Sequence, residues 1–152
     1  VATFCAALWL TFTLPLTNPE VKIVGLGSPG GAVVEAIRAG YLIRARGLET
    51  TQIADCFSAC PIVFLGGSRR TVWSGTAAMG FHEVSNNGKA IPHDDPMYDL
   101  LYRFITDMGA NPRVIISWMW SAEPDQMLIR QWDDLCQVGV ATFVYHTCLA
   151  EN

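Results

Sequence analysis

The sequence predicts an α/β layered fold with a mainly parallel sheet built from repeated strand-helix units. Two observations support this prediction. The β-branched run 21–26 (VKIVGL) ends in a glycine-rich turn, and a helical pattern follows at 32–47. Extended and helical patterns keep alternating through residue 84, which is typical of a parallel sheet. A chain of 152 residues, 51% of them hydrophobic, is long enough for one compact domain with a real core.

The first half of the chain predicts two strand-turn-helix units. After the extended run, Gly30 and Gly31 make a tight turn that leads into the first helix. Apolar residues recur at helical spacing within 32–47, and Gly47 follows as a helix stop. The next elements are expected in this order: a strand at 48–54, a helix at 56–67, and strands at 70–74 and 76–84.

The second half begins with a polar segment and continues mainly as helix. Residues 85–96 are rich in turn-forming residues, which predicts an exposed loop. Helices are expected at 97–109 and at 111–122, where Pro112 is placed for a first turn. The tail predicts extended pieces at 127–129 and 141–147 around a short helix at 132–139. No internal repeat or linker divides the chain, so residues 1–152 are expected to form a single domain.

The N-terminal residues 1–16 carry no charge. Their number falls short of the roughly 20 apolar residues that cross a bilayer as a helix. We therefore expect an apolar helix at 1–16, which is either the first helix of the domain or the remnant of a membrane anchor.

Charge and cysteine content exclude several classes of function. The net charge is -4 and the basic residues are scattered, so no nucleic-acid partner is expected. Five cysteines without C-x-x-C spacing predict neither a zinc ribbon nor a dense disulfide scaffold, and they leave the compartment open. Cys56 and Cys60 are four residues apart, which in a helix favours core packing over a disulfide. The adjacent His93, Asp94 and Asp95 indicate a solvated turn rather than a metal site.

A serine stands between two cysteines where a strand is expected to give way to a helix. At such a junction the backbone N–H of Ala59, directly after Ser58, belongs to a helix start. Gly31 opens the preceding helix in the same way, and two such donors facing the Ser58 hydroxyl would make a nucleophile with an oxyanion hole. His82 ends the strand expected after Ser58 and is the histidine best placed as a base. The alternative role of Ser58 is that of a helix N-cap.

The chain resembles the Clp protease and crotonase-like superfamily in three segments, GSPGGAVVEAIRAGYLIRARGLET, CFSACPIVFLGGSRR and AAMGFHE. It is most similar to the ClpP-class serine peptidases of the predicted periplasmic or membrane-associated bacterial branch, in colinear order over about residues 18–142. The resemblance implies a ClpP/crotonase-like fold. It makes Ser58 the nucleophile, His82 the base, and the N–H groups of Gly31 and Ala59 the oxyanion hole. It also places the apolar N-terminus on the family's first helix, which implies that the family's opening strand is absent.

Two positions depart from the family pattern. Gly27 precedes the S-P-G-G turn, where the family usually has asparagine. Met127 falls where ClpP-type enzymes carry the aspartate of the triad. The nearest carboxylate is Asp125, which we expect as the third residue, and a Ser-His dyad without an acid is the alternative. A histidine without its acid lowers activity by orders of magnitude but does not abolish it.

Together, the residues and the resemblance predict an ATPase-independent serine peptidase that requires no cofactor and no metal. The first alternative is a catalytically degenerate ClpP-like scaffold or accessory subunit of a membrane complex. The second is a crotonase-type acyl-CoA enzyme that uses the same two N–H donors. The resemblance further implies a peptide or protein substrate, a homo-oligomer or larger assembly, and a location in the bacterial periplasm or at the membrane.

Overall fold

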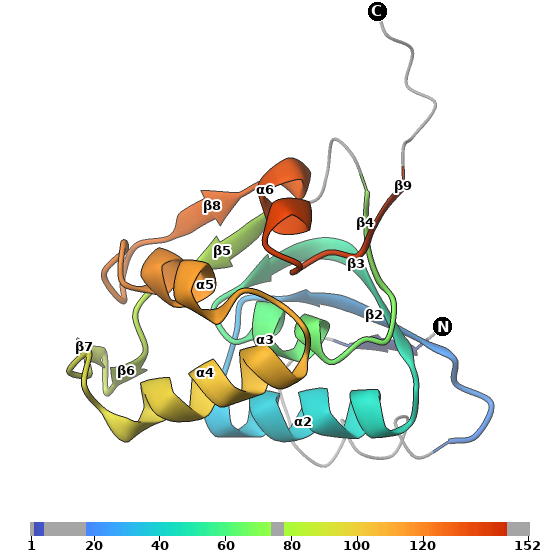
Figure 1. The fold of residues 1–152 in the computed structure, drawn as a ribbon, viewed down its shortest axis with the longest axis horizontal. Helices are drawn as coiled ribbons and strands as arrows, with labels where there is room; N and C mark the ends of the chain where they lie inside the picture. Colours follow the sequence, from blue (N-terminus) through green and yellow to red (C-terminus); the bar gives the residue numbers. More distant parts are fainter. Residues whose placement is uncertain (1, 5–17, 74–77, 146–152) are drawn as a thin grey trace, which may run out of the picture.

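The computed structural model describes residues 2–4, 18–73 and 78–145 (Figure 1). Its main sheet has seven strands in the order β1-β2-β3-β4-β9, with β5 paired to β3 and β8 paired to β5. All of these pairs are parallel except β5 with β8, so the predicted α/β fold with a mainly parallel sheet is confirmed. The strands are β1 (Ala2–Phe4), β2 (Ile23–Ser28), β3 (Glu49–Phe57), β4 (Arg70–Trp73), β5 (Met79–Phe81), β8 (Leu128–Arg130) and β9 (Phe143–Tyr145).

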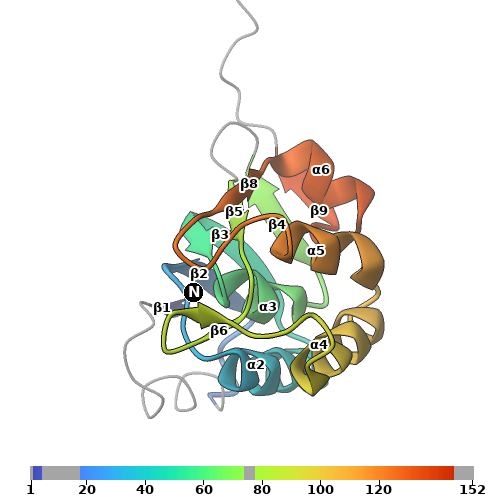
Figure 2. The same cartoon turned by 90° about the vertical axis from the view of Figure 1, so that its left-hand side faces the viewer.

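The helices gather mainly on one side of this sheet. Figures 1 and 2 show α2, α3 and α4 together there, with α3 between the sheet and the other two helices. The helices are α2 (Val33–Ala45), α3 (Cys60–Leu65), α4 (Pro96–Asp107), α5 (Pro112–Met119) and α6 (Trp132–Gln137). None of the described helices combines the length and the apolar composition that crossing a membrane requires.

The helix α3 forms the centre of the core. All six of its residues are buried, and Phe64 is fully enclosed. It approaches α2 so closely that a Cβ added at Gly66 would lie 2.6 Å from the Cα of Gly40. A Cβ at Gly40 would in turn meet the ring of Phe104 from α4. Small residues at these two positions let three helices pack closely together at the C-terminal end of α3.

The strand β3 runs further than its sequence pattern predicts. It continues to Phe57, so the helix expected at 56–67 begins only at Cys60 and ends at Leu65. The reason is that the end of β3 has a partner on each side: Cys56 pairs with Ser28 of β2 and with Met79 of β5. Backbone groups that are satisfied on both sides by sheet neighbours favour an extended conformation over a helical turn.

The prediction of an apolar helix over residues 1–16 is wrong for the part that the structure describes. Ala2–Phe4 form the strand β1, which pairs in parallel with β2, so a strand does precede β2. This pairing provides hydrogen-bond partners for backbone groups of β2 that would otherwise lack them at the edge of the sheet. The remainder of the apolar segment, residues 5–16, lies outside the described residues.

The polar segment 85–96 is exposed as predicted, but its first half is an ordered hairpin. The strands β6 (Ser85–Asn86) and β7 (Lys89–Ala90) pair antiparallel. The turn between them is made by Asn87 and Gly88, with φ values of 50° and 76°. Positive φ at both central positions is the geometry of an Asn-Gly hairpin turn. The Asn-Gly pair is thus the sequence signal that could have predicted this hairpin.

Candidate active site

Ser58 lies in the turn that joins β3 to α3. Its backbone has a φ of 60°, and its N–H donates to the carbonyl oxygen of Gly80 on β5 at 2.9 Å. A residue with a side chain in this left-handed region costs about 1–3 kcal/mol, and strain of this kind is concentrated at functional sites. A strained strand-to-helix turn is also the geometry that exposes the nucleophilic serine of α/β-hydrolases. The backbone of Ser58 is therefore held in a conformation that suits a nucleophile.

The alternative role of Ser58 as a helix N-cap is wrong. The N-cap of α3 is Ala59, and no side chain among the described residues caps this helix. Because β3 extends to Phe57, Ser58 stands one residue before the cap. Within the part of the chain that the structure describes, its hydroxyl has no hydrogen-bond partner.

Gly30 packs directly against the Ser58 side chain. A Cβ added at Gly30, whose φ is 119°, would lie 2.5 Å from the Cβ of Ser58 and 2.9 Å from its Oγ. The N–H of Gly30 donates to the Oγ of Ser28 at 3.1 Å, which fixes the turn on the β2 side. A glycine is needed here for both its backbone conformation and its lack of a side chain, so the S-P-G-G turn supports the serine sterically.

A cavity of about 420 Å³ brings together four of the five predicted site residues. Gly31, Ser58, Ala59 and His82 all line it, although they come from three separate segments of the chain. The apolar part of the wall comes from Val33, Val34, Ile62, Val84, Ile91, Met97 and Met119. The wall also carries the polar residues Glu83, Ser85, Asn86 and Asp95, and a pocket that combines apolar side chains with convergent polar groups is typical of a binding or active site.

The backbone N–H groups of Gly31 and Ala59 have no hydrogen-bond acceptor among the residues that the structure describes. A Cβ added at Gly31 would meet nothing within 4 Å, so this side of the turn is open to the cavity. The N–H of Ser58 itself is bonded to Gly80 and is not available. Two unsatisfied donors that line one cavity with a serine make an arrangement that can hold a negatively charged oxygen.

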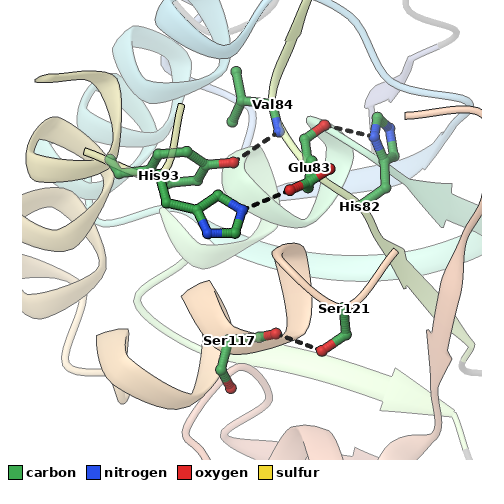
Figure 3. A network of polar contacts seen from close by, with 7 residues as sticks. His82, Glu83, Val84, His93, Ser117 and Ser121 are labelled. Atoms are coloured by element: carbon green, nitrogen blue, oxygen red, sulfur yellow. Dashed lines mark hydrogen bonds and ion pairs between the residues drawn. The ribbon is translucent and has the colours of Figure 1, made fainter. Parts of the chain in front are cut away.

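His82 follows β5 and has its ring held by the backbone. The Nδ1 atom lies 2.8 Å from the carbonyl oxygen of Glu83 (Figure 3). Because a carbonyl oxygen can only accept, this contact places the proton of the neutral ring on Nδ1 and the lone pair on Nε2. In a triad the carboxylate maintains this tautomer, and here a backbone carbonyl does so. No hydrogen bond joins His82 to Ser58 among the described residues, and in many enzymes this bond tightens only when substrate binds.

A polar and aromatic cluster fixes the segment that carries His82. The carboxylate of Glu83 pairs with Nε2 of His93 at 2.6 Å (Figure 3). The His93 ring stacks on Trp120 with 4.5 Å between centroids. The N–H of Val84 donates to the Tyr98 hydroxyl at 3.1 Å. The carboxylate next to His82 is thus occupied by another histidine, and the cluster anchors residues 83–84 to α4 and to the end of α5. No sequence pattern indicates these contacts, because they join residues from separate elements.

In the described part of the chain, no hydrogen bond links Asp125 to His82. Asp125 is exposed in the turn before β8, does not line the cavity, and has no hydrogen bond or ion pair within the described residues. Met127 instead covers Gly80, where an added Cβ would lie 2.5 Å from the Met127 Sδ. An apolar side chain therefore packs on β5 two residues before His82, and the assignment of Asp125 as the third residue stays a prediction without support from the geometry.

The prediction that Cys56 and Cys60 only pack in the core is wrong, because they form a disulfide. Cys56 belongs to β3 and Cys60 begins α3, and their Cα atoms are 5.2 Å apart. This separation suits a disulfide, whereas the prediction assumed that both residues lie on one regular helix. Cys136 is a free thiol. No cluster of three metal-ligating side chains occurs in the described part of the chain.

Comparisons with known proteins connect this geometry to a fold. No protein-family model matches the sequence, and no curated protein matches it. Among solved structures, the chain is similar to 1510-N, a membrane-bound stomatin-specific protease determined as a mutant in complex with a substrate peptide. The TM-score is 0.65 at 16% sequence identity, over 96% of this chain and 74% of the protease chain. The chain has a ClpP-like protease fold. At this level of identity the similarity is one of fold.

Within the ClpP-like fold, the candidate site lies at the carboxyl ends of three adjacent parallel strands. The strand β2 leads into the S-P-G-G turn, β3 leads into Ser58, and β5 leads into His82. Neighbouring parallel strands end at the same edge of a sheet, so their following loops converge there. This topology explains why residues that are 24 or more positions apart line one cavity.

Proposed function

We propose that the chain is a serine peptidase that works without its own ATPase. Nε2 of His82 takes the hydroxyl proton as Oγ of Ser58 attacks a peptide carbonyl carbon. The N–H groups of Gly31 and Ala59 stabilise the oxyanion of the tetrahedral intermediate. The C–N bond then breaks, His82 gives the proton to the leaving amine, and an acyl-Ser58 ester remains. Water deprotonated by His82 attacks this ester, which releases the acid and restores Ser58.

The proposal rests on the backbone conformation of Ser58 and on its place in the cavity. Ser58 holds a left-handed backbone at a strand-to-helix turn, inside a cavity that it shares with a histidine and two unbonded backbone donors. A serine with a purely structural role has no need of this costly conformation. The apolar wall beside it would accommodate an apolar side chain of a peptide substrate, because burial of such a group in the cavity is favourable.

The decisive experiment is to react the purified protein with a fluorophosphonate and to locate the label by peptide mass spectrometry. We expect the label on Ser58, because only a serine with an activated hydroxyl attacks this reagent readily. Ser58→Ala should abolish the labelling. Ser121→Ala is the matched control, because Ser121 is exposed and its hydroxyl donates to the Ser117 carbonyl at 2.6 Å (Figure 3).

A specific observation favours a second candidate, a catalytically degenerate scaffold or accessory subunit. Met127 occupies the place that the family resemblance assigns to the acid, and no carboxylate bonds to His82 in the described residues. A protein that is folded but remains unlabelled at Ser58, even after long exposure to the fluorophosphonate, would reject the peptidase and support the scaffold.

We also propose a location in the bacterial periplasm or at the membrane, and assembly into homo-oligomers. The Cys56–Cys60 disulfide supports the periplasm, because disulfides persist in oxidising compartments and are rare in the cytosol. Exposed Ile53, Ile129 and Tyr145 offer apolar surface to a second subunit. Alkylating thiols in intact bacteria should leave Cys56 and Cys60 unmodified, and modification of both would argue for a reducing compartment. Light scattering of the purified protein should give a mass above that of one chain.

A further inference from the structure

We propose that the Cys56–Cys60 disulfide is a covalent lock that holds Ser58 in its reactive conformation. This inference rests on the proposed role of Ser58 as a nucleophile. The disulfide closes a loop of only three intervening residues, Phe57, Ser58 and Ala59. That loop contains both the nucleophile and one of the two oxyanion donors.

The two ends of this loop are anchored in different ways. Cys56 is fully buried and is held by the strands on either side, through its pairing with Ser28 and with Met79. Cys60 is the first residue of α3, whose buried side chains pack in the core. The S–S bond therefore links a fixed strand to a fixed helix across the turn. It limits the conformations that the three residues between them can adopt.

Without the S–S bond, two contacts within the described residues remain to hold Ser58 at its φ of 60°. One is the hydrogen bond from its N–H to the Gly80 carbonyl, and the other is the close packing against Gly30. A left-handed residue relaxes to an ordinary conformation when its surroundings stop enforcing it. Such a change would move Oγ relative to His82 and would turn the Ala59 N–H away from the oxyanion position.

Opening the lock requires a reductant, for which we name a dithiol. Because both cysteines are buried, the turn must open before one thiolate of the dithiol can attack a sulfur of the Cys56–Cys60 disulfide and form a mixed disulfide. The second thiolate resolves it and becomes part of a cyclic disulfide, while both cysteine sulfurs leave as thiols. Two electrons and two protons pass to the protein. The free thiol of Cys136 is a poor competitor in this exchange, because burial raises its pKa and disfavours the thiolate.

The test uses the full chain with Cys5, Cys136 and Cys148 replaced by serine, so that only the pair of interest responds to reductant. Oxidised and dithiol-reduced samples are compared by two measurements. Amide hydrogen exchange by NMR reports on the N–H of Ser58 independently of any activity. The rate of fluorophosphonate labelling reports on the reactivity of Oγ.

We expect reduction to speed exchange at the Ser58 amide while amides of the core strands keep their protection. Labelling should become about 10- to 100-fold slower, because a shift of the order of 1 Å at a reacting atom has this effect. Reoxidation should restore both. A Cys56→Ala/Cys60→Ala variant is the matched control, because it should behave like the reduced protein and not respond to the dithiol.

Unchanged exchange at Ser58, or an unchanged labelling rate in the reduced protein, would overturn the lock. A uniform rise in exchange over the whole domain would also overturn it, because the disulfide would then stabilise the fold in general. If the oxidised protein is never labelled, the peptidase proposal fails instead. The exchange at Ser58 then decides by itself whether the disulfide holds the turn.

Discussion

His82→Ala is expected to slow fluorophosphonate labelling of Ser58 roughly a thousandfold or more, which is the scale seen when the base of a triad is removed. The reason is geometric. His82 lines the cavity of Ser58, and its Nδ1 proton is bound by the Glu83 carbonyl, so Nε2 is left as the proton acceptor. No other histidine lines this cavity within the described residues. The labelling rate is measured by quenching the reaction at a series of times and determining the labelled fraction by intact-protein mass spectrometry.

The matched control for this variant is His93→Ala. His93 is half-exposed and does not line the cavity, but it pairs with Glu83 and helps to hold the segment that carries His82, so its removal should slow labelling far less than His82→Ala does. Equal rates for the natural protein and His82→Ala would remove the base from the mechanism. The same result would leave Ser58 as a serine whose reactivity depends on something other than a histidine.

Arg70→Met is expected to lower the free energy of unfolding by about 3 kcal/mol or more. The Arg70 guanidinium is 4% exposed and donates to the carbonyl oxygens of Val140 and Gly139, both at 2.8 Å, and of Gly67 at 3.0 Å. Methionine fills a similar volume but cannot donate, so buried carbonyl groups lose their partner. For a chain of this length the melting temperature should fall by about 6–12 °C in a thermal scan.

Arg69→Met is the matched control. Arg69 is the exposed neighbour of Arg70 and stacks on the Phe143 ring at 3.9 Å from its centroid, so Arg69→Met should lower the free energy of unfolding only slightly.

Burial, and then the charge of Arg44, lower the pKa of Arg70 to about 10. The pKa of Arg70 is thus lower in the folded protein than in the unfolded chain. The folded protein therefore gives up this proton first, and the stability gained in this way appears only as the pH rises above about 10. Arg70→Met should therefore lower the free energy of unfolding by the same amount at pH 6 and pH 8. A difference between the two pH values would contradict this explanation.

The sequence predicted the elements that have strong local signals. The strand predicted at 21–26 lies at Ile23–Ser28, and the glycine turn and the following helix lie close to their predicted places. Each depends on side-chain periodicity or on backbone freedom within a few residues. Ser58 was placed at a strand-to-helix junction on the same grounds. The boundary of that junction was wrong by several residues, since the length of β3 depends on strands on either side of it.

The candidate site shows the same division between local and long-range information. Gly31, Ser58, Ala59 and His82 could be proposed from motifs, and the structure places them around one cavity. The sequence could not show whether Asp125 lies beside His82, because the distance between them depends on how the turn before β8 folds. The Cys56–Cys60 disulfide was missed because spacing alone does not show that one partner is in a strand and the other in a helix.

The sequence by itself determined the α/β class, the order of most elements, and the residue types available for a serine nucleophile, a base and an oxyanion hole. These depend on patterns that repeat every two to four residues and on a few glycine turns. Only the tertiary structure decided that Ser58 takes a left-handed conformation, that Met127 rather than a carboxylate packs on β5, and that a disulfide closes the turn. Each of these results from contacts between segments that lie apart in the chain or belong to different elements, and no local pattern encodes such contacts.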